Sequence, residues 1–298
     1  MNAVRTTDVT RRYREVTALD GVSISLAENT IHGLLGRNGA GKTTLMRVLT
    51  GQEFPTAGSV EVFGQAPREN PHVASRTCFV KESQRYPDPF QVRHALAAAA
   101  LAFPHWDGSF ARELVGEFAL PVRRPVKKLS RGQLSAVGVV IGLASRAPLT
   151  FFDEPYLGLD AVARQLFYDR LLADYAEHPR TVVLSTHLID EVSDLIENVV
   201  VIDAGRVLLD GDADDLRRRA VTVSGPVDEV ERFVAGHAEL HREALGGRLR
   251  VTVSGAPDRA APAGVELEPV SLQQLVVRTT QMNDDRSARP SALVGESR

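Results

Sequence analysis

The feature that most constrains the fold of this chain is the run GRNGAGKT at residues 36–43, which fits the pattern G-x-x-x-x-G-K-[ST]. An apolar segment, Thr30–Leu35, precedes the run. A helix-like segment, Thr44–Leu49, follows it, with Gly51 placed to end the helix. Glycines let a backbone turn its N–H groups towards an anion, and the start of a helix adds partial positive charge. This strand, loop and helix therefore predict a site for phosphate groups.

The side chains of this phosphate loop suit a nucleotide and its metal ion. We expect Lys42 to reach the β- and γ-phosphates and the Thr43 hydroxyl to ligate Mg²⁺. The backbone of the remaining positions is expected to surround the phosphates. The candidate nucleotide-binding residues of the loop are Gly36, Asn38, Gly39, Ala40, Gly41, Lys42, Thr43 and Thr44.

Composition limits the other functions open to the chain. Its 298 residues suffice for one large domain or for a domain with a smaller companion. A net charge of −3 argues against a broadly basic surface for nucleic acid. The one cysteine, Cys78, excludes a disulfide within the chain and fits a reducing compartment. No apolar run approaches about 18 residues and residues 1–6 carry no apolar leader, so we expect a cytoplasmic chain.

Apolar β-branched runs alternate with helical patterns as far as about residue 215, which predicts an α/β domain around a mainly parallel sheet. Residues from about 83 to 148 read mostly helical and predict a helical insertion between two parts of the sheet. The clear strand candidates are Val60–Phe63, Cys78–Val80, Leu149–Phe152, Thr181–Leu184 and Val199–Ile202.

The pattern changes after about residue 215, where a small α+β domain is predicted over residues 216–280. Strand patterns at Ala220–Ser224 and Arg248–Ser254 surround a helical pattern at Val227–Val234. A second helical pattern follows at Ser271–Thr280. Residues 281–298 are polar and lack periodicity, so we expect a disordered tail.

A second candidate anion site lies at the run LSRGQ, residues 129–133, which precedes an apolar helical run from Ala136 to Ala144. A serine hydroxyl and a glycine N–H at the start of a helix can bind an anion. Taken alone, the run is equally well an ordinary turn that caps a helix. Its position before the motifs described next favours the binding role.

Two acids end the strand candidate Leu149–Phe152, and a histidine follows another strand candidate. Asp153 is expected to hold Mg²⁺, and Glu154 to polarise an attacking water. His187 ends the run LSTH at residues 184–187, at the sheet edge where parallel sheets bind ligands. Taken singly, such acids and such a histidine more often serve structure alone, and it is their order along the chain that indicates a site.

These motifs, and the order in which they follow one another along the chain, resemble those of the ATP-binding-cassette (ABC) ATPases over roughly residues 1–215. LSRGQ resembles the family's signature loop, LSGGQ, with arginine at the third position. GLD at residues 158–160 resembles the D-loop, which contacts the opposite subunit. The resemblance implies a P-loop NTPase core with an antiparallel edge subdomain. It also implies that Lys42, Glu154 and His187 are catalytic, with His187 contacting the γ-phosphate and the water.

The resemblance also implies roles for two further positions. Tyr13 falls where the family stacks an aromatic ring on adenine, although ordinary packing at an edge would also explain it. The glutamine of the family's Q-loop falls on Glu82, as in related sub-families, and Glu82 is therefore a candidate metal contact. Gln84 is the rival for this position if the loop is shifted.

The family works as a head-to-tail pair of cassettes, in which each ATP lies between the phosphate loop of one subunit and the signature loop of the other. The resemblance therefore implies a second cassette, identical or different, that receives Ser130, Gly132, Gln133 and Asp160. It also implies separate transmembrane permease subunits, coupled through a groove near the Q-loop and the helical insertion. The chain would lie at the inner face of the membrane, with ATP and Mg²⁺ as its cofactors.

The run SLQQLVV at residues 271–277 resembles the closing motif of drug-exporter and ABC-2-type ATPases, with Gln-Gln in place of an acidic pair. With the single cassette, it favours export. The alternative is a soluble ABC ATPase acting on ribosomes or DNA. Such proteins usually carry two cassettes or a long coiled-coil insertion, and neither is present here, nor is a basic tract. A GTPase is disfavoured because the chain has no Asn-Lys-x-Asp motif. These patterns do not identify the cargo.

Overall fold

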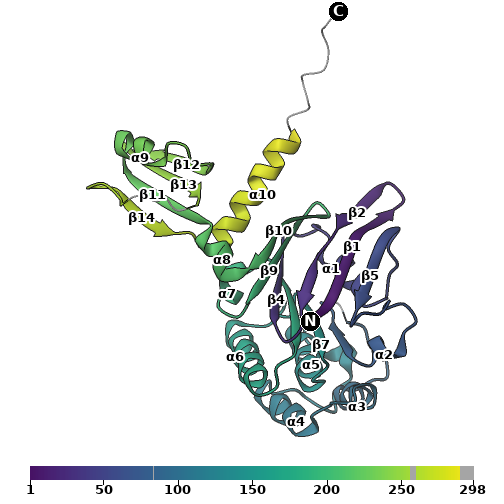
Figure 1. Ribbon diagram of the computed structural model, residues 1–298. Helices are drawn as coiled ribbons and strands as arrows, with labels where there is room; N and C mark the ends of the chain where they lie inside the picture. The colour runs from purple at the N-terminus through teal and green to yellow at the C-terminus, as the bar shows by residue number, and fades with distance from the viewer. Residues whose placement is uncertain (83, 256–259, 289–298) are drawn as a thin grey trace, which may run out of the picture. The chain divides into compact units, whose positions relative to one another are not determined.

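The computed structural model describes residues 1–82, 84–255 and 260–288. The chain forms two compact units, the first made of residues 1–188 and 195–210 and the second of residues 189–194 and 211–298. Figure 1 labels their elements. The division in the chain thus falls between residues 210 and 211, where the sequence patterns placed it at about 215, and the second unit also takes the short segment 189–194.

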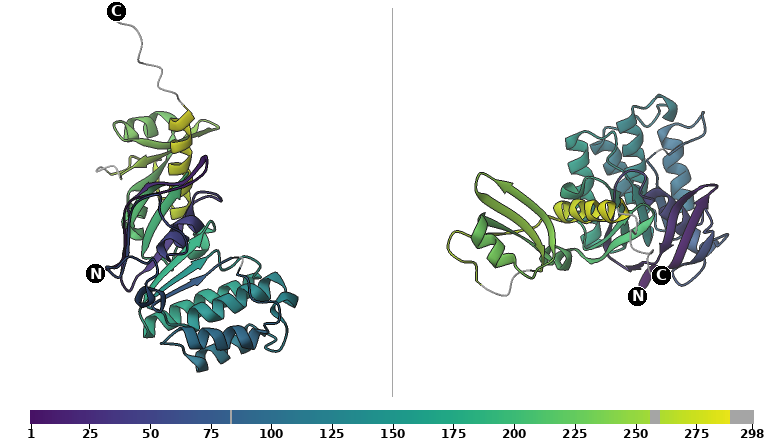
Figure 2. Two further views of the ribbon diagram at one scale, coloured as in Figure 1. Left: turned by 90° about the vertical axis from the view of Figure 1, so that its right-hand side faces the viewer. Right: turned by 90° about the horizontal axis from the view of Figure 1, so that it is seen from above.

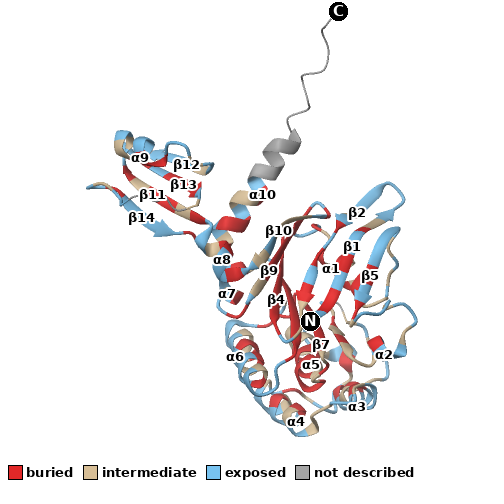
Figure 3. Ribbon diagram, viewed as in Figure 1, coloured by how far each residue is buried: buried red, intermediate tan, exposed pale blue. Residues whose placement is uncertain are grey.

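The first unit is built on a six-stranded sheet with the strand order β10-β9-β4-β8-β7-β6. β4 runs parallel to β8 and β9, and β7 runs parallel to β6 and β8. Every residue of β4, β7 and β8 is buried, which explains why their sequences are continuous rather than alternating apolar runs (Figure 3). The bounds are β4 (Ile31–Leu35), β6 (Thr77–Val80), β7 (Leu149–Asp153), β8 (Thr181–Thr186), β9 (Asn198–Asp203) and β10 (Arg206–Asp212).

Helices pack against this sheet, and those between residues 92 and 144 form the predicted helical insertion. Helix α5 contacts β6 and β7, and Gly142 is needed there because a Cβ atom would lie 2.4 Å from the ring of Phe152. Helices α3 and α4 pack beside α5 (Figure 2). The bounds are α1 (Lys42–Leu49), α2 (Pro71–Ala74), α3 (Val92–Ala102), α4 (Gly108–Glu117), the 3₁₀ helix η1 (Val126–Lys128), α5 (Arg131–Ala144) and α6 (Ala161–Glu177).

The first unit also contains the antiparallel edge subdomain that the resemblance implied. Its central strand β1 (Asn2–Tyr13) pairs antiparallel with β2 (Val16–Val22), β3 (Ser25–Ala27) and β5 (Ala57–Val62). The buried apolar side chains of this sheet share one core with those of α1. β5 begins three residues earlier than the expected strand Val60–Phe63, and its last residue, Val62, is one residue earlier than the expected end.

The second unit is a four-stranded antiparallel sheet with the order β12-β13-β11-β14. Helix α9 packs on one face, where Val230 and Phe233 join Val251 and Val253 in a separate core. Helix α10 begins after Ser271, whose hydroxyl accepts a hydrogen bond from the N–H of Gln274 at 3.2 Å. The bounds are α7 (Ile189–Val192), α8 (Ala213–Arg218), β11 (Ala220–Pro226), α9 (Val227–Val234), β12 (Glu239–Leu245), β13 (Arg248–Ser254), β14 (Glu266–Pro269) and α10 (Leu272–Ala288).

The structure corrects the expectation of a disordered tail from residue 281. Helix α10 continues to Ala288, and the remaining residues, 289–298, lie outside the described part of the chain. Residues 281–288 contain neither glycine nor proline, so the helix can extend through them although they carry no apolar stripe. In the described ranges, no helix combines the length and apolar character that a membrane span requires.

Candidate functional site

A cavity of about 500 Å³ lies over the loop between β4 and α1. All of its lining residues belong to the first unit, and they come from β2, the phosphate loop and the start of α1, the start of α5, and the segments that follow β6, β7 and β8. This placement follows the rule that parallel sheets bind ligands at the carboxyl ends of their strands. The lining residues are Ala18, Arg37, Asn38, Gly39, Ala40, Gly41, Lys42, Thr43, Thr44, Glu82, Arg131, Glu154, Leu157 and His187.

Two glycines allow the phosphate loop to lie tightly against its neighbours. Gly36 has φ +152°, and a Cβ atom there would lie 2.1 Å from the carbonyl oxygen of Ile202. Gly41 has φ +110°, and a Cβ atom would lie 2.6 Å from the carbonyl oxygen of Ala18. Helix α1 begins directly after Gly41, with no side-chain cap and no acidic residue in its first turn. Its N-terminal N–H groups are therefore free to bind an anion.

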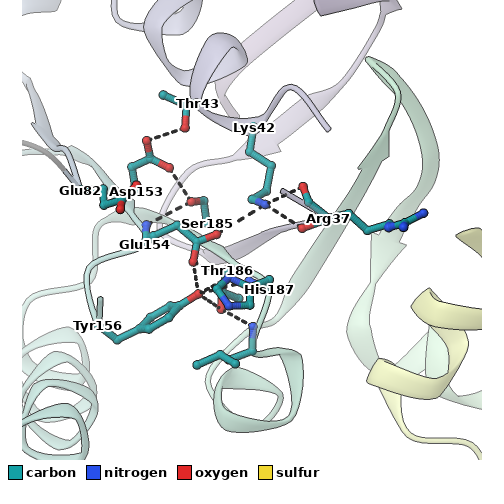
Figure 4. A network of polar contacts seen from close by, with 12 residues as sticks. Arg37, Lys42, Thr43, Glu82, Asp153, Glu154, Tyr156, Ser185, Thr186 and His187 are labelled. Carbon is teal, nitrogen blue, oxygen red and sulfur yellow. Dashed lines mark hydrogen bonds and ion pairs between the residues drawn. The ribbon is translucent and has the colours of Figure 1, made fainter. Parts of the chain in front are cut away.

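Lys42 places a buried positive charge at the centre of the loop. The side chain is only 6% exposed. Its Nζ donates hydrogen bonds to the carbonyl oxygens of Gly36 at 2.6 Å and Arg37 at 3.1 Å, and it lies 3.4 Å from Oε1 of Glu154 (Figure 4). A buried ammonium requires such partners because its desolvation is costly. The arrangement brings the loop and the end of β7 into direct electrostatic contact.

Thr43 and Asp153 provide oxygen atoms suited to a magnesium ion. Oγ1 of Thr43 donates to Oδ2 of Asp153 at 2.8 Å, and Oγ of Ser185 donates to Oδ1 of Asp153 at 2.7 Å (Figure 4). Mg²⁺ prefers hard oxygen ligands and in nucleotide sites takes few from the protein. Across the described residues, no cluster of three or more His, Cys, Asp or Glu side chains is arranged to hold a metal by itself. These oxygens therefore fit an ion whose other ligands are phosphates and water.

Glu154 directs one carboxylate oxygen to polar partners and leaves the other without a hydrogen bond. It follows β7 with φ +50°, and its N–H donates to Oγ of Ser185 at 3.2 Å. Oε2 lies 2.9 Å from Nδ1 of His187 and accepts a hydrogen bond from the hydroxyl of Tyr156. Oε1 is buried with no hydrogen-bond partner, and the Lys42 ammonium is its charged neighbour. Oε1 is thus the carboxylate oxygen that carries no hydrogen bond and could accept a proton from water.

The signature loop starts helix α5 with a capping box. Oγ of Ser130 accepts from the N–H of Gln133 at 3.1 Å, and Oε1 of Gln133 accepts from the N–H of Ser130 at 3.2 Å. Gly132 lies against the D-loop, where a Cβ atom would be 2.3 Å from the carbonyl oxygen of Gly158. Asp160 caps α6 by accepting from the N–H of Ala163 at 2.8 Å. The structure does not bring Ser130, Gly132, Gln133 or Asp160 to the lining of the cavity in their own chain.

At the Q-loop, the structure brings Glu82 to the cavity, whereas Gln84 does not line it. Oε1 of Glu82 lies 2.8 Å from Nη2 of Arg131, the residue that replaces a glycine of the usual signature loop. Both side chains are well exposed, so this ion pair adds little to stability. It shows, however, that the two departures from the family's motifs meet at one edge of the cavity.

Tyr13 is not among the residues that line the cavity. The Arg11 guanidinium lies over the Tyr13 ring, 4.5 Å from its centroid, and the hydroxyl donates to Glu53. Both contacts hold the ring at the end of β1. Stacking of Tyr13 on adenine therefore stays a prediction.

Sequence reasoning missed two polar residues of the site, Tyr156 and Ser185. Both lie inside motifs that were recognised, in the runs DEPY at residues 153–156 and LSTH at residues 184–187. Ser185 binds Asp153, and Tyr156 binds Glu154, so each supports a neighbouring acid. Their positions directly beside the acid and the histidine were the available signal, because residues at the ends of adjacent parallel strands meet at one edge of the sheet.

Comparisons with known proteins agree with this geometry. The family model described as ABC transporter matches residues 19–157. A daunorubicin resistance ATP-binding protein from Streptomyces coeruleorubidus is 29% identical over 314 residues, which cover 95% of this chain and 96% of the relative. A Nod factor export ATP-binding protein I from Burkholderia pseudomallei is 33% identical over 254 residues, covering 83% of this chain and 82% of the relative.

A solved structure of an ATP-binding subunit of an ABC transporter is also similar, with 25% identity and a TM-score of 0.66 over 72% of this chain and 92% of the other. Sequence and fold thus agree, and the chain belongs to the ATP-binding proteins of ABC transporters. The resemblance inferred from the motifs is confirmed, as is the P-loop α/β fold.

Proposed function

We propose that this chain hydrolyses ATP to power export through separate transmembrane subunits. The observation that carries the proposal is the convergence of Lys42, Glu154 and His187 on one cavity beside the metal-binding oxygens of Thr43 and Asp153. A site that only binds a nucleotide would need Lys42 but neither Glu154 nor His187. A carboxylate oxygen that accepts no hydrogen bond, next to the lysine expected to bind phosphate, supports hydrolysis as well as binding.

In the mechanism that we propose, the phosphate loop binds the triphosphate through its N–H groups and the Lys42 ammonium. Thr43 and Asp153 hold Mg²⁺, which neutralises phosphate charge when bound. Oε1 of Glu154 orients a water and accepts its proton, while His187 contacts the γ-phosphate. The chain thus contributes binding, charge stabilisation and proton transfer, the main requirements of phosphoryl transfer.

A second cassette completes this proposed site. Ser130, Gly132, Gln133 and Asp160 all lie at helix N-termini or turns that can bind phosphate or the opposite subunit, yet they lie outside the cavity lining of their own chain. A head-to-tail dimer would place them over the partner's ATP, where they stabilise charge in the transition state. The dimer can be formed by two copies of this chain or by two different cassettes.

Export and a location at the inner face of the membrane are supported by the relatives. One relative is named for daunorubicin resistance and another for Nod factor export. The SLQQLVV run at residues 271–277 points to the same sub-family. Both relatives are named as ATP-binding proteins, and in the transporter that we propose the transport path would be supplied by separate permease subunits. We expect no nucleic acid among the partners.

The proposal is tested by purifying the tagged full chain from detergent-solubilised membranes of its own cells. We expect a multi-span membrane protein to co-purify and the complex to release phosphate from Mg²⁺-ATP. A preparation from cells that carry the tag alone is the control. Co-purification with ribosomes or DNA and without a membrane protein would support the soluble alternative and contradict a role in transport.

A further inference from the structure

The hydroxyl of Tyr156 lies at the centre of the polar contacts beside the nucleotide cavity, and the mechanism above gives it no role. Tyr156 is 2% exposed. Its hydroxyl contacts Oε2 of Glu154 and lies 3.1 Å from Nδ1 of His187 (Figure 4). The hydroxyl of Thr186, at 2.9 Å, and the backbone N–H of His187, at 3.2 Å, donate to it. One phenol thus joins the ends of β7 and β8.

Counting protons identifies the direction of these hydrogen bonds. A phenol has one proton to donate and two lone pairs that accept. The hydroxyl of Thr186 and the N–H of His187 use the accepting positions, which leaves the phenolic proton for Oε2 of Glu154. Burial and the neighbouring Glu154 raise the pKa of Tyr156, so the phenol keeps this proton at neutral pH.

This arrangement makes the two oxygens of Glu154 unequal. Oε2 is held by the hydroxyl of Tyr156 and lies within hydrogen-bond distance of Nδ1 of His187, whereas Oε1 has no hydrogen-bond partner. Glu154 lines the cavity, and its Oε1 lies 3.4 Å from Nζ of Lys42. Anchoring one oxygen restricts rotation of the carboxylate and keeps the other available to a water.

We propose that Tyr156 is a positioning residue for ATP hydrolysis, whose hydroxyl holds Oε2 of Glu154 so that Oε1 serves the attacking water. This inference rests on the proposed function, in which Glu154 activates the water. The role belongs to the hydroxyl rather than to the ring. The ring packs edge-on against His187 with centroids 5.8 Å apart, and a phenylalanine would keep that contact.

The test is Tyr156→Phe in the full chain, with Tyr175→Phe as the matched control. The hydroxyl of Tyr175 is also bonded to the protein, to the carbonyl oxygen of Asn29 at 2.7 Å and to Glu197 at 2.8 Å, but it does not line the cavity. We expect kcat for ATP hydrolysis to fall at least roughly tenfold in Tyr156→Phe only. The Kd for ATP, measured by calorimetry, should match that of the control, whereas the Tm should fall because the hydroxyl of Thr186 and the N–H of His187 lose their acceptor.

A double variant separates positioning from general structural support. Because the hydroxyl acts through Glu154, adding Tyr156→Phe to Glu154→Gln should cause no further loss of turnover. An unchanged kcat in Tyr156→Phe overturns the inference. A further loss in the double variant does so too, as does a weaker ATP affinity than in the control. An absence of turnover in the purified membrane complex of the wild-type chain with ATP bound overturns the proposed function and this inference together, whereas normal kcat in Tyr156→Phe overturns the inference alone.

Discussion

At the scale of residues, the site depends on opposite charges buried next to each other. Lys42 and Glu154 are both nearly inaccessible and their charged atoms lie 3.4 Å apart. Burying either charge alone would be costly, so each stabilises the position of the other. Substituting one of them therefore changes binding or chemistry and also leaves the remaining charge without compensation.

Glu154→Gln is expected to leave ATP binding intact and to lower turnover by roughly 10²–10⁴-fold, because an amide cannot accept the proton of the water. The bound ATP would then persist, and the closed dimer should accumulate. Phosphate release measures the turnover, and sedimentation in the presence of ATP measures the dimer. Glu177→Gln removes the same charge at the exposed end of α6 and serves as the control. Wild-type turnover in Glu154→Gln would disprove the role of Glu154.

Lys42→Ala is expected to weaken ATP binding by roughly 10–100-fold, because charged hydrogen bonds to the phosphates are lost. Calorimetric titration with ATP measures the change. Lys127→Ala is the matched control, since Lys127 is an exposed lysine of η1 that lies outside the cavity lining. Equal affinities for the two variants would contradict the assignment of the phosphate loop.

At the scale of elements, glycines determine how closely the parts of the site approach one another. Gly36 and Gly41 let the phosphate loop lie against backbone carbonyl groups, and Gly132 does the same for the start of α5 against the D-loop. Each of these positions excludes a Cβ atom at its present distance. Gly132 therefore determines how closely the start of α5 approaches the D-loop.

Gly132→Ala should lower stability by about 1–3 kcal/mol, because the new Cβ atom would lie 2.3 Å from the carbonyl oxygen of Gly158 and α5 or the D-loop must move. Denaturant unfolding measures the change. Gly116→Ala in α4 is the control, since nothing lies within 4 Å of its added Cβ atom and the change should stabilise by up to about 1 kcal/mol. Equal free energies of unfolding for the two variants would show that the contact has no energetic weight.

At the scale of the whole molecule, the nucleotide cavity belongs entirely to one of the two compact units. The second unit has its own core, built from α9 and the sheet that contains β11 and β13. It also includes the segment 189–194, where α7 packs with α10. The second unit thus contributes no residue to the lining of the nucleotide cavity, although the chain passes between the two units more than once.

A chain ended at residue 210 should therefore bind ATP with a Kd within about threefold of the full chain. Its Tm should be lower, because α7 loses the helix against which it packs. Calorimetry and thermal unfolding measure the two quantities on the same samples. A loss of affinity greater than about tenfold would show that the second unit contributes to the nucleotide site.

The sequence by itself was sufficient for the local parts of the fold and site. These parts are continuous segments whose structure depends on residues adjacent in the sequence. They are the phosphate loop, the run that ends in Asp153 and Glu154, and the buried strands β4, β7 and β8. Strands β1 and β2 were harder to recognise because charged residues interrupt them, β3 because it has only three residues, and β14 because none of its residues is buried. Helix α10 was shortened in the prediction because its last residues lack an apolar stripe.

Only the tertiary structure decided which side chains meet. Pairing of strands brings Tyr156 to His187 and Ser185 to Asp153, across separations of about 30 residues that no local pattern records. Likewise, Glu82 lies beside Arg131, and the hydroxyl of Tyr13 contacts Glu53. The physical reason is that local motifs depend on neighbouring residues, whereas contacts at the edge of a parallel sheet depend on strand order and on the packing of the helices between the strands.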